Sequence, residues 1–189
     1  MEYEHRQRAG RPEYMALVLR AAEFAALKHQ DQRRKGESER PYIGHCIEVA
    51  RMIAEIGKSD DPTILSAAIL HDTLEDTETT REELAQIFGE RITDFVVQVT
   101  DDKSLKKGER KKLQVEHAPH LSPGAKLIKI ADKISNVREI ASDPPKGWDN
   151  KRREKYFKWA KEVVDALGTV NADLQKEFEQ TLEKSRATL

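Results

Sequence analysis

The sequence predicts an all-α protein, a single-domain bundle of about seven to ten helices. Two observations predict this class. Apolar residues recur at intervals of three and four through most of the chain, which is the spacing that lines one face of a helix. Glycine and proline stand mostly at the ends of these segments. The 189 residues fit one domain with a substantial core, so a single catalytic unit is expected.

The first half of the chain is expected to form helices over residues 14–29, 42–56, 64–76 and 77–89, after a polar leader at residues 1–12. The first of these helices ends at His29, and a charged loop closed by Pro41 follows it. Gly57 stops the second helix. Asp61 and Pro62 then open the third, because an aspartate N-cap followed by proline favours a helix start.

The second half is expected to form helices over residues 91–102, 125–140, 150–167 and 171–185. The valines and threonines of residues 91–102 also allow a strand, but no neighbouring segment offers it a partner, so a helix is predicted. Residues 103–112 are expected to form a loop that is rich in basic side chains. Asp143 and the two prolines after it end the long helix over residues 125–140.

Composition excludes several classes of protein. The chain has 33 basic and 34 acidic residues and a net charge of −1, which gives no general argument for binding nucleic acid or a membrane. The single Cys46 excludes an internal disulfide and a cysteine zinc site, and it fits a reducing compartment. The N-terminus lacks an apolar signal sequence, and no later stretch is long enough to span a bilayer. A cytoplasmic protein is therefore expected.

The stretch from residue 64 to 76, ILSAAILHDTLED, is the most informative in the chain. On one continuous helix His71, Asp72, Glu75 and Asp76 would share a face, because they are three and four residues apart. Such a group, desolvated beside apolar residues, costs several kcal/mol unless something compensates it. A bound cation would do so. The alternative is a capping box for the next helix, which explains Asp76 but not the His71-Asp72 pair.

Two further residues complete a candidate ligand set with His71 and Asp72. His45 lies in the first turn of its predicted helix, and a lone histidine there is more often a core residue than a ligand. Asp132 lies in the middle of the helix over residues 125–140, where an aspartate beside the apolar stripe is costly without a partner. Together these residues offer two nitrogen and two oxygen ligands, which favours Mn²⁺ and also allows Zn²⁺ or Fe²⁺.

This ligand set predicts hydrolysis of a phosphate compound. A divalent ion polarises water and draws charge from a phosphoryl oxygen, and Glu75 and Asp76 are placed to orient that water and take its proton. Two basic segments, residues 33–35 and 103–112, can be ordinary solvated loops or an anion-holding rim. The rim is the more specific interpretation, because a phosphate-binding site needs several converging cations.

The sequence closely resembles the HD-domain phosphohydrolases through His45, His71-Asp72 and Asp132, which match the pattern H…HD…D. HDTLED extends the resemblance to the hydrolase domain of the RelA/SpoT alarmone enzymes. Further segments, listed here, look most like the stand-alone small alarmone hydrolases of the Mesh1 type: HQDQRRKG, RPYIGH, VTDDKSL and ADKISNVR. The resemblance covers nearly the whole chain. Cys46 and Gly108 depart from the usual family pattern without touching a proposed ligand.

The resemblance implies an HD-type helical fold and an enzyme that removes the 3′-diphosphate of ppGpp or pppGpp, yielding GDP or GTP and diphosphate, with manganese bound. It implies that His45, His71, Asp72 and Asp132 bind the metal and that Glu75 and Asp76 are catalytic. It also implies that Arg34 and Lys35 hold the nucleotide, with Arg34 stacking on the purine, and that the remaining substrate contacts come from Asn136, Lys107, Arg152 and Tyr156.

Rival interpretations stay open. The same chemistry can act on NADPH, removing its 2′-phosphate, or on adenine alarmones, because a stacking arginine tolerates either base. An HD-type nucleoside monophosphatase would keep the four ligands but would not need Arg34. A non-catalytic alarmone-binding module would gain nothing from Glu75 and Asp76 beside phosphate. A helical chain with an exposed apolar face could also form a homodimer, although the sequence locates no such face.

Overall fold

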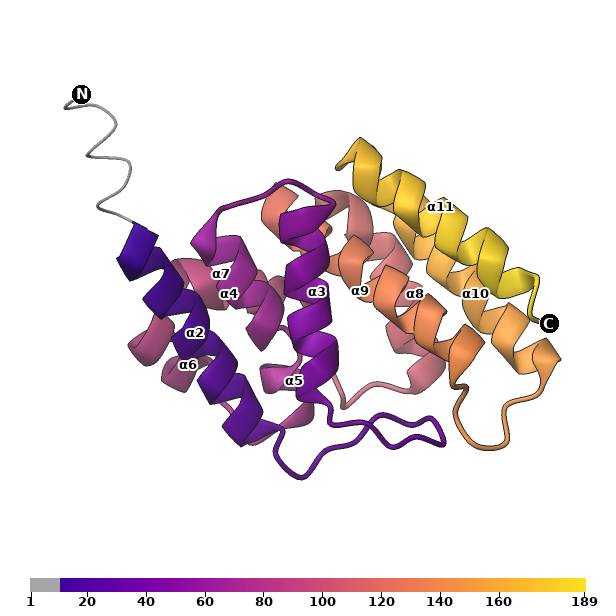
Figure 1. Ribbon diagram of the computed structural model, residues 1–189, viewed down its shortest axis with the longest axis horizontal. Helices are drawn as coiled ribbons and strands as arrows, with labels where there is room; N and C mark the ends of the chain where they lie inside the picture. Colours follow the sequence, from indigo (N-terminus) through magenta and orange to yellow (C-terminus); the bar gives the residue numbers. More distant parts are fainter. Residues whose placement is uncertain (1–10) are drawn as a thin grey trace.

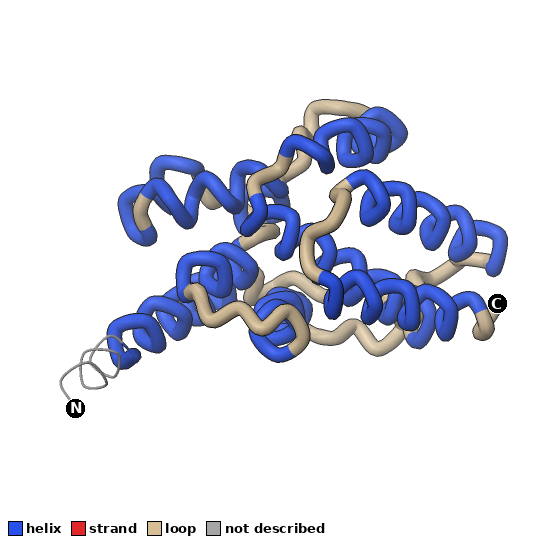
Figure 2. The backbone as a smooth tube through the Cα atoms, turned by 90° about the horizontal axis from the view of Figure 1, so that it is seen from above, coloured by secondary structure: helices blue, strands red, loops and turns tan. Residues whose placement is uncertain are grey.

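The computed structural model describes residues 11–189, and in this part of the chain no strand accompanies the helices (Figures 1 and 2). The helices are α2 (Arg11–Lys28), α3 (Ile43–Glu55), α4 (Pro62–Leu70), α5 (Thr73–Asp76), α6 (Arg81–Phe88), α7 (Glu90–Val99), α8 (Lys107–His117), the 3₁₀-helix η1 (Ala118–His120), α9 (Pro123–Ser142), α10 (Asn150–Ala166) and α11 (Ala172–Arg186). The all-α prediction is confirmed. The prediction of a helix rather than a strand at residues 91–102 is confirmed as far as Val99, where α7 ends.

The core forms around α4 and α9. The second half of α4 is buried and apolar, through Ala67, Ala68, Ile69 and Leu70, and this helix packs against α2, α3 and α7. Helix α9 packs against α3, α10 and α11 and buries residues on several of its sides. In Figure 1, α2 and α6 lie at one end of the bundle and α10 and α11 at the other. The centre therefore joins α3, α4 and α9.

The expected single helix over residues 64–76 is interrupted, so that prediction is wrong. Helix α4 ends at Leu70, His71 and Asp72 form a turn, and the one-turn helix α5 follows. Two local hydrogen bonds accompany the break: Nδ1 of His71 lies 2.8 Å from the Ala68 carbonyl oxygen, and the Thr73 hydroxyl donates to the Leu70 carbonyl at 2.7 Å. His71 and Asp72 are thus not on the same helical face as the acids of α5.

The basic segment 103–112 was expected to be a loop, but most of it lies in helix α8, which begins at Lys107. No residue of α8 is fully buried, so the segment has no clear apolar stripe to signal a helix. The helix packs against α10, and Nε1 of Trp159 donates to the backbone carbonyl of Lys111 at 3.0 Å. Tertiary contacts thus stabilise a helix that its own sequence predicts weakly.

The N-terminal boundary also differs from the prediction. Residues 1–10 of the expected polar leader lie outside the described residues, whereas Arg11 and Pro12 already belong to α2. Proline fits there because the first backbone N–H groups of a helix have no intrahelical partner. Among the described helices, none combines the length and apolar character needed to cross a bilayer.

Candidate metal centre and adjoining cavity

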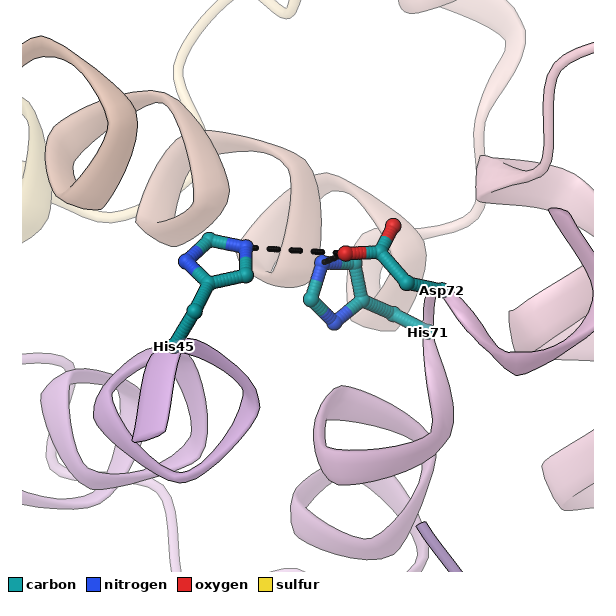
Figure 3. A group of neighbouring side chains, drawn as sticks. All are labelled: His45, His71 and Asp72. Atoms are coloured by element: carbon teal, nitrogen blue, oxygen red, sulfur yellow. Dashed lines mark ion pairs between the residues drawn. The ribbon is translucent and has the colours of Figure 1, made fainter. Parts of the chain in front are cut away.

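His45, His71, Asp72 and Asp132 come together in the middle of the bundle, and we refer to them as the His–Asp cluster. His45 lies in the first turn of α3, His71 and Asp72 form the turn between α4 and α5, and Asp132 lies in the middle of α9. Nε2 of His71 is 3.0 Å from Oδ2 of Asp72, and Nε2 of His45 is 3.3 Å from Oδ1 of Asp132. Figure 3 shows both imidazole rings directed at the Asp72 carboxylate.

The cluster fits a divalent cation. One ligand atom each from His45, His71 and Asp72 lie within 4.8 Å of one another. Nε2 of His45 and Nε2 of His71 are buried and have no hydrogen-bond partner, although unpartnered buried nitrogens are costly. In His71, Nδ1 must donate to the Ala68 carbonyl, because a carbonyl only accepts, so Nε2 is the atom that faces the cluster. A metal ion would satisfy both orphaned nitrogens.

The electrostatics of the cluster also favour a cation. Burial lowers the pKa of His71, but Asp72 and Asp132 outweigh it and raise that pKa to about 10. Burial alone would raise the pKa of Asp132, yet Lys133 and the two histidines hold it well below its usual range. The carboxylates therefore stay ionised and attract positive charge, whether a proton or a metal ion.

The two predicted catalytic acids lie on α5, next to the cluster. Glu75 accepts a hydrogen bond from the backbone N–H of Asp101 at 3.1 Å, and Arg110 lies 3.7 Å from its other oxygen. Burial, reinforced by neighbouring carboxylates, raises the pKa of Glu75. Asp76 is paired with Lys103. A carboxylate with a raised pKa is suited to accept a proton near neutral pH.

Tyr42 is a site residue that was not predicted from the sequence. Its hydroxyl donates to Oδ2 of Asp72 at 2.7 Å and lies 3.4 Å from Oδ2 of Asp76. The tyrosine therefore connects the cluster to the acidic pair. It belongs to the RPYIGH motif, but nothing in the spacing of the chain marked it as different from an ordinary aromatic residue before a helix.

A cavity of about 470 Å³ opens beside the cluster. Six of the predicted site residues line it together with Tyr42: Arg34, Lys35, Asp76, Lys107, Asn136 and Tyr156. Asn136 links cavity and cluster, because its amide donates to Oδ1 of Asp132. Arg152 does not line the cavity itself, but its guanidinium lies 4.6 Å from the centroid of Trp148, which does. The structure thus gathers the predicted substrate contacts at one place.

Arg34 is held firmly at the rim of this cavity. Its Nη2 donates to Oδ1 of Asn136 at 2.8 Å, it is paired with Glu139, and its guanidinium lies 5.4 Å from the Tyr42 ring centroid. Burial opposes the charge, but Glu139 more than compensates and raises the pKa of Arg34. The side chain is therefore a fixed cation with a planar face, which suits the predicted stacking role.

Three further residues that line the cavity were not predicted from the sequence as site residues: Lys111, Trp148 and Trp159. Nζ of Lys111 lies 4.2 Å from the Trp159 ring centroid and 5.3 Å from that of Tyr156. Lys107 lies one turn earlier on the same face of α8. The signal was hidden because the segment was expected to be a loop, in which no helical face aligns these two lysines.

Comparison with known proteins agrees with this arrangement. A sequence profile of the HD domain matches residues 21–173. The chain is 51% identical over 160 residues to guanosine-3′,5′-bis(diphosphate) 3′-pyrophosphohydrolase MESH1 of Xenopus tropicalis, over 85% of this chain and 89% of the relative. The human protein of that name is 47% identical over 174 residues, 92% of this chain and 97% of the relative.

A solved structure, described as a metazoan orthologue of SpoT that hydrolyses ppGpp, superposes with a TM-score of 0.87 at 42% identity, over 92% of this chain and 97% of that one. The HD-domain match includes all four residues of the His–Asp cluster. Because the match spans most of the chain and the relatives are about half identical over nearly their whole length, the chain belongs to the HD-domain family, in its Mesh1 branch.

Proposed function

We propose that this protein is a metal-dependent hydrolase that removes the 3′-diphosphate of the guanosine alarmones ppGpp and pppGpp. The products are GDP or GTP and diphosphate. The names of the MESH1 relatives support this activity. The observation that carries the proposal is the pair of orphaned histidine nitrogens beside two carboxylates, next to a cavity with cations on its walls. That combination suits the hydrolysis of a highly charged phosphate compound.

In the proposed site, the His–Asp cluster holds Mn²⁺, with Zn²⁺ or Fe²⁺ as alternatives. When bound, a divalent ion lowers the pKa of a water molecule and withdraws charge from a phosphoryl oxygen. Glu75 acts as the base that takes a proton from the attacking water, because its raised pKa and partial burial suit that role. Asp76, paired with Lys103, orients the water.

The remaining predicted contacts bind the nucleotide. Arg34 and Lys35 hold the nucleotide, with Arg34 stacking on the base. Asn136 contacts the ribose or base, and phosphate groups are met by Lys107, Arg152 and Tyr156. Stacking tolerates guanine and adenine alike, so ppApp and NADPH are the alternative substrates to be tested. A homodimer is a further prediction, and exposed apolar residues of α2 such as Met15 and Leu19 are candidates for its interface.

Product analysis tests the proposal. Metal-stripped protein is re-supplied with Mn²⁺ and given ppGpp, ppApp, NADPH and dAMP in parallel, beside Glu75→Gln. We expect GDP and diphosphate from ppGpp, and a loss of kcat of about 10²–10⁴-fold in Glu75→Gln, because a positioned general base contributes that much. The ranking of kcat/KM values identifies the preferred nucleotide.

Arg34→Ala separates the alarmone hydrolase from a nucleoside monophosphatase. If the protein is an alarmone hydrolase, Arg34→Ala should have a lower affinity for ppGpp than the wild type. If it is a monophosphatase, Arg34→Ala should turn over dAMP as fast as the wild type does. Turnover of dAMP alone would contradict the proposal. Binding of ppGpp without cleavage, in the wild type with Mn²⁺ present, would indicate a non-catalytic alarmone-binding module instead.

A further inference from the structure

Behind His45, a serine and a glutamate form a hydrogen-bonded chain that the proposed reaction does not use. Ser135 of α9 is buried, and its Oγ lies 2.9 Å from Nδ1 of His45. The same hydroxyl donates to Oε2 of Glu48 at 2.7 Å. Glu48 in turn accepts from Nη1 of Arg138 at 2.7 Å through its other oxygen. His45 is thus held at the ring nitrogen opposite to Nε2, which faces the cluster.

Donor and acceptor chemistry assigns the protons in this chain. A carboxylate paired with arginine only accepts hydrogen bonds, so Ser135 gives its single hydroxyl hydrogen to Glu48. The serine oxygen must then accept from His45, and Nδ1 of His45 carries the proton. In a neutral imidazole, a proton on Nδ1 leaves a lone pair on Nε2, which is the form that binds a metal.

The chain is anchored on three helices. Arg138 also donates through Nη2 to Oε1 of Glu177 at 3.0 Å, which ties α3 and α9 to α11. Ser135 stands three residues after Asp132 on α9, so these two residues lie on neighbouring positions of one helical face. That face of α9 therefore supplies one proposed ligand, Asp132, and also the group that orients another, His45.

We propose that Ser135 and Glu48 are positioning residues that fix the tautomer and orientation of His45 in the His–Asp cluster. This inference rests on the proposed metal centre and deepens it. Ser135, Glu48 and His45 also line a separate cavity of about 250 Å³, so water has room beside them. A variant without the serine hydroxyl can recruit water there, which makes its loss of affinity a lower bound.

Metal affinity tests the inference. Mn²⁺ is titrated calorimetrically into the metal-stripped full-length chain. We expect Ser135→Ala to bind Mn²⁺ about 10-fold more weakly or worse, because partners that orient metal ligands typically contribute 10–100-fold in affinity. Ser135→Thr keeps the hydroxyl and should bind within about threefold of the wild type. Ser142→Ala is the matched control, since that hydroxyl bonds only to carbonyls of its own helix.

A tautomer measurement supplies a readout that a merely structural role would not change. Long-range ¹H–¹⁵N spectra of the metal-free full-length chain report which ring nitrogen of His45 is protonated. We expect the proton on Nδ1 in the wild type and in Ser142→Ala, and a mixture of tautomers in Ser135→Ala. Glu48→Gln should also give a mixture, because its amide can donate to Ser135 and so reverse the direction of the hydrogen bonds.

The outcomes separate this inference from the proposed function. A wild type that binds no Mn²⁺, or His71→Ala that binds it as tightly as the wild type, would overturn the metal centre and with it the role of Ser135. The positioning role alone would be overturned if the wild type binds Mn²⁺ tightly and Ser135→Ala has the same affinity and the same His45 tautomer. Weak binding in Ser135→Ala that Ser135→Thr restores would support it.

Discussion

At the scale of single residues, Lys111 has an environment that makes its charge depend on pH. Its ammonium group lies over the rings of Trp159 and Tyr156, and the side chain lines the cavity. Burial, followed by the positive charges of Lys107 and Lys133, lowers the pKa of Lys111 to about 8. Only the charged form of Lys111 attracts a phosphate group strongly, so the free enzyme is suited to bind phosphate through this side chain below about that pH.

We therefore predict that the contribution of Lys111 to kcat/KM is present near pH 7 and lost as the pH rises through about 8. The reason is that kcat/KM follows the ionisation of the free enzyme. Lys111→Met should lower kcat/KM for ppGpp about 10-fold near pH 7, the worth of one charged hydrogen bond. Near pH 9.5 the two proteins should converge. A ratio that stays constant between about pH 6.5 and 9.5 would mean that Lys111 does not bind the substrate.

The residues of this site differ in how far the sequence could predict them. His71, Asp72 and Asp132 stood out because ionisable groups in apolar helices need a partner, and the structure brings them together with His45. Tyr42 and Lys111 could not be found in this way. A tyrosine before a helix and a lysine in a basic segment are ordinary features, and only the tertiary packing gives them neighbours.

At the scale of elements, the loop that carries Arg34 and Lys35 depends on a close approach at Gly36. A Cβ at Gly36 would lie 2.6 Å from the Asp143 carbonyl oxygen, which is too close. The Asp143 side chain also accepts from the Glu37 backbone N–H at 2.8 Å and from the Ser38 hydroxyl. The end of α9 thus fixes the position of the loop.

Gly36→Ala should displace the loop and raise KM for ppGpp by about 10-fold, because misplaced binding groups can cost up to about 10²-fold. The affinity for Mn²⁺ should not change, since the His–Asp cluster lies outside the loop. Gly108→Ala is the control: a Cβ there meets nothing within 4 Å, and alanine should stabilise α8 by about 0.5–1 kcal/mol. Steady-state kinetics measure KM, and metal titration measures the affinity for Mn²⁺. An unchanged KM in Gly36→Ala would show that the loop tolerates the shift.

Elements were predictable where their sequence carries a periodic apolar stripe, as in α3 and α9. The break between α4 and α5 was not, because the hydrogen bonds of His71 and Thr73 that accompany it give no signal in the hydropathy of the segment. Helix α8 was not predicted, because none of its residues is fully buried and no apolar stripe marks it. Its packing against α10 stabilises it instead.

At the scale of the whole molecule, the His–Asp cluster connects parts of the bundle that are far apart in the sequence. Its residues come from the start of α3, the turn between α4 and α5, and the middle of α9. A metal ion bound to all four would cross-link these elements in the folded state, and the unfolded chain would hold it much less tightly. Metal binding is therefore expected to stabilise the fold as a whole.

At a Mn²⁺ concentration of about 100 times its Kd, the free energy of unfolding should rise by about 2.7 kcal/mol. For a chain of this size that corresponds to an increase in Tm of about 5–10 °C. Thermal unfolding of metal-stripped protein with and without Mn²⁺ measures the shift, and His71→Ala should abolish it while keeping the helical circular dichroism spectrum. An equal shift in His71→Ala would place the stabilising ion outside the cluster, because a site that loses one of two nitrogen ligands cannot keep its affinity.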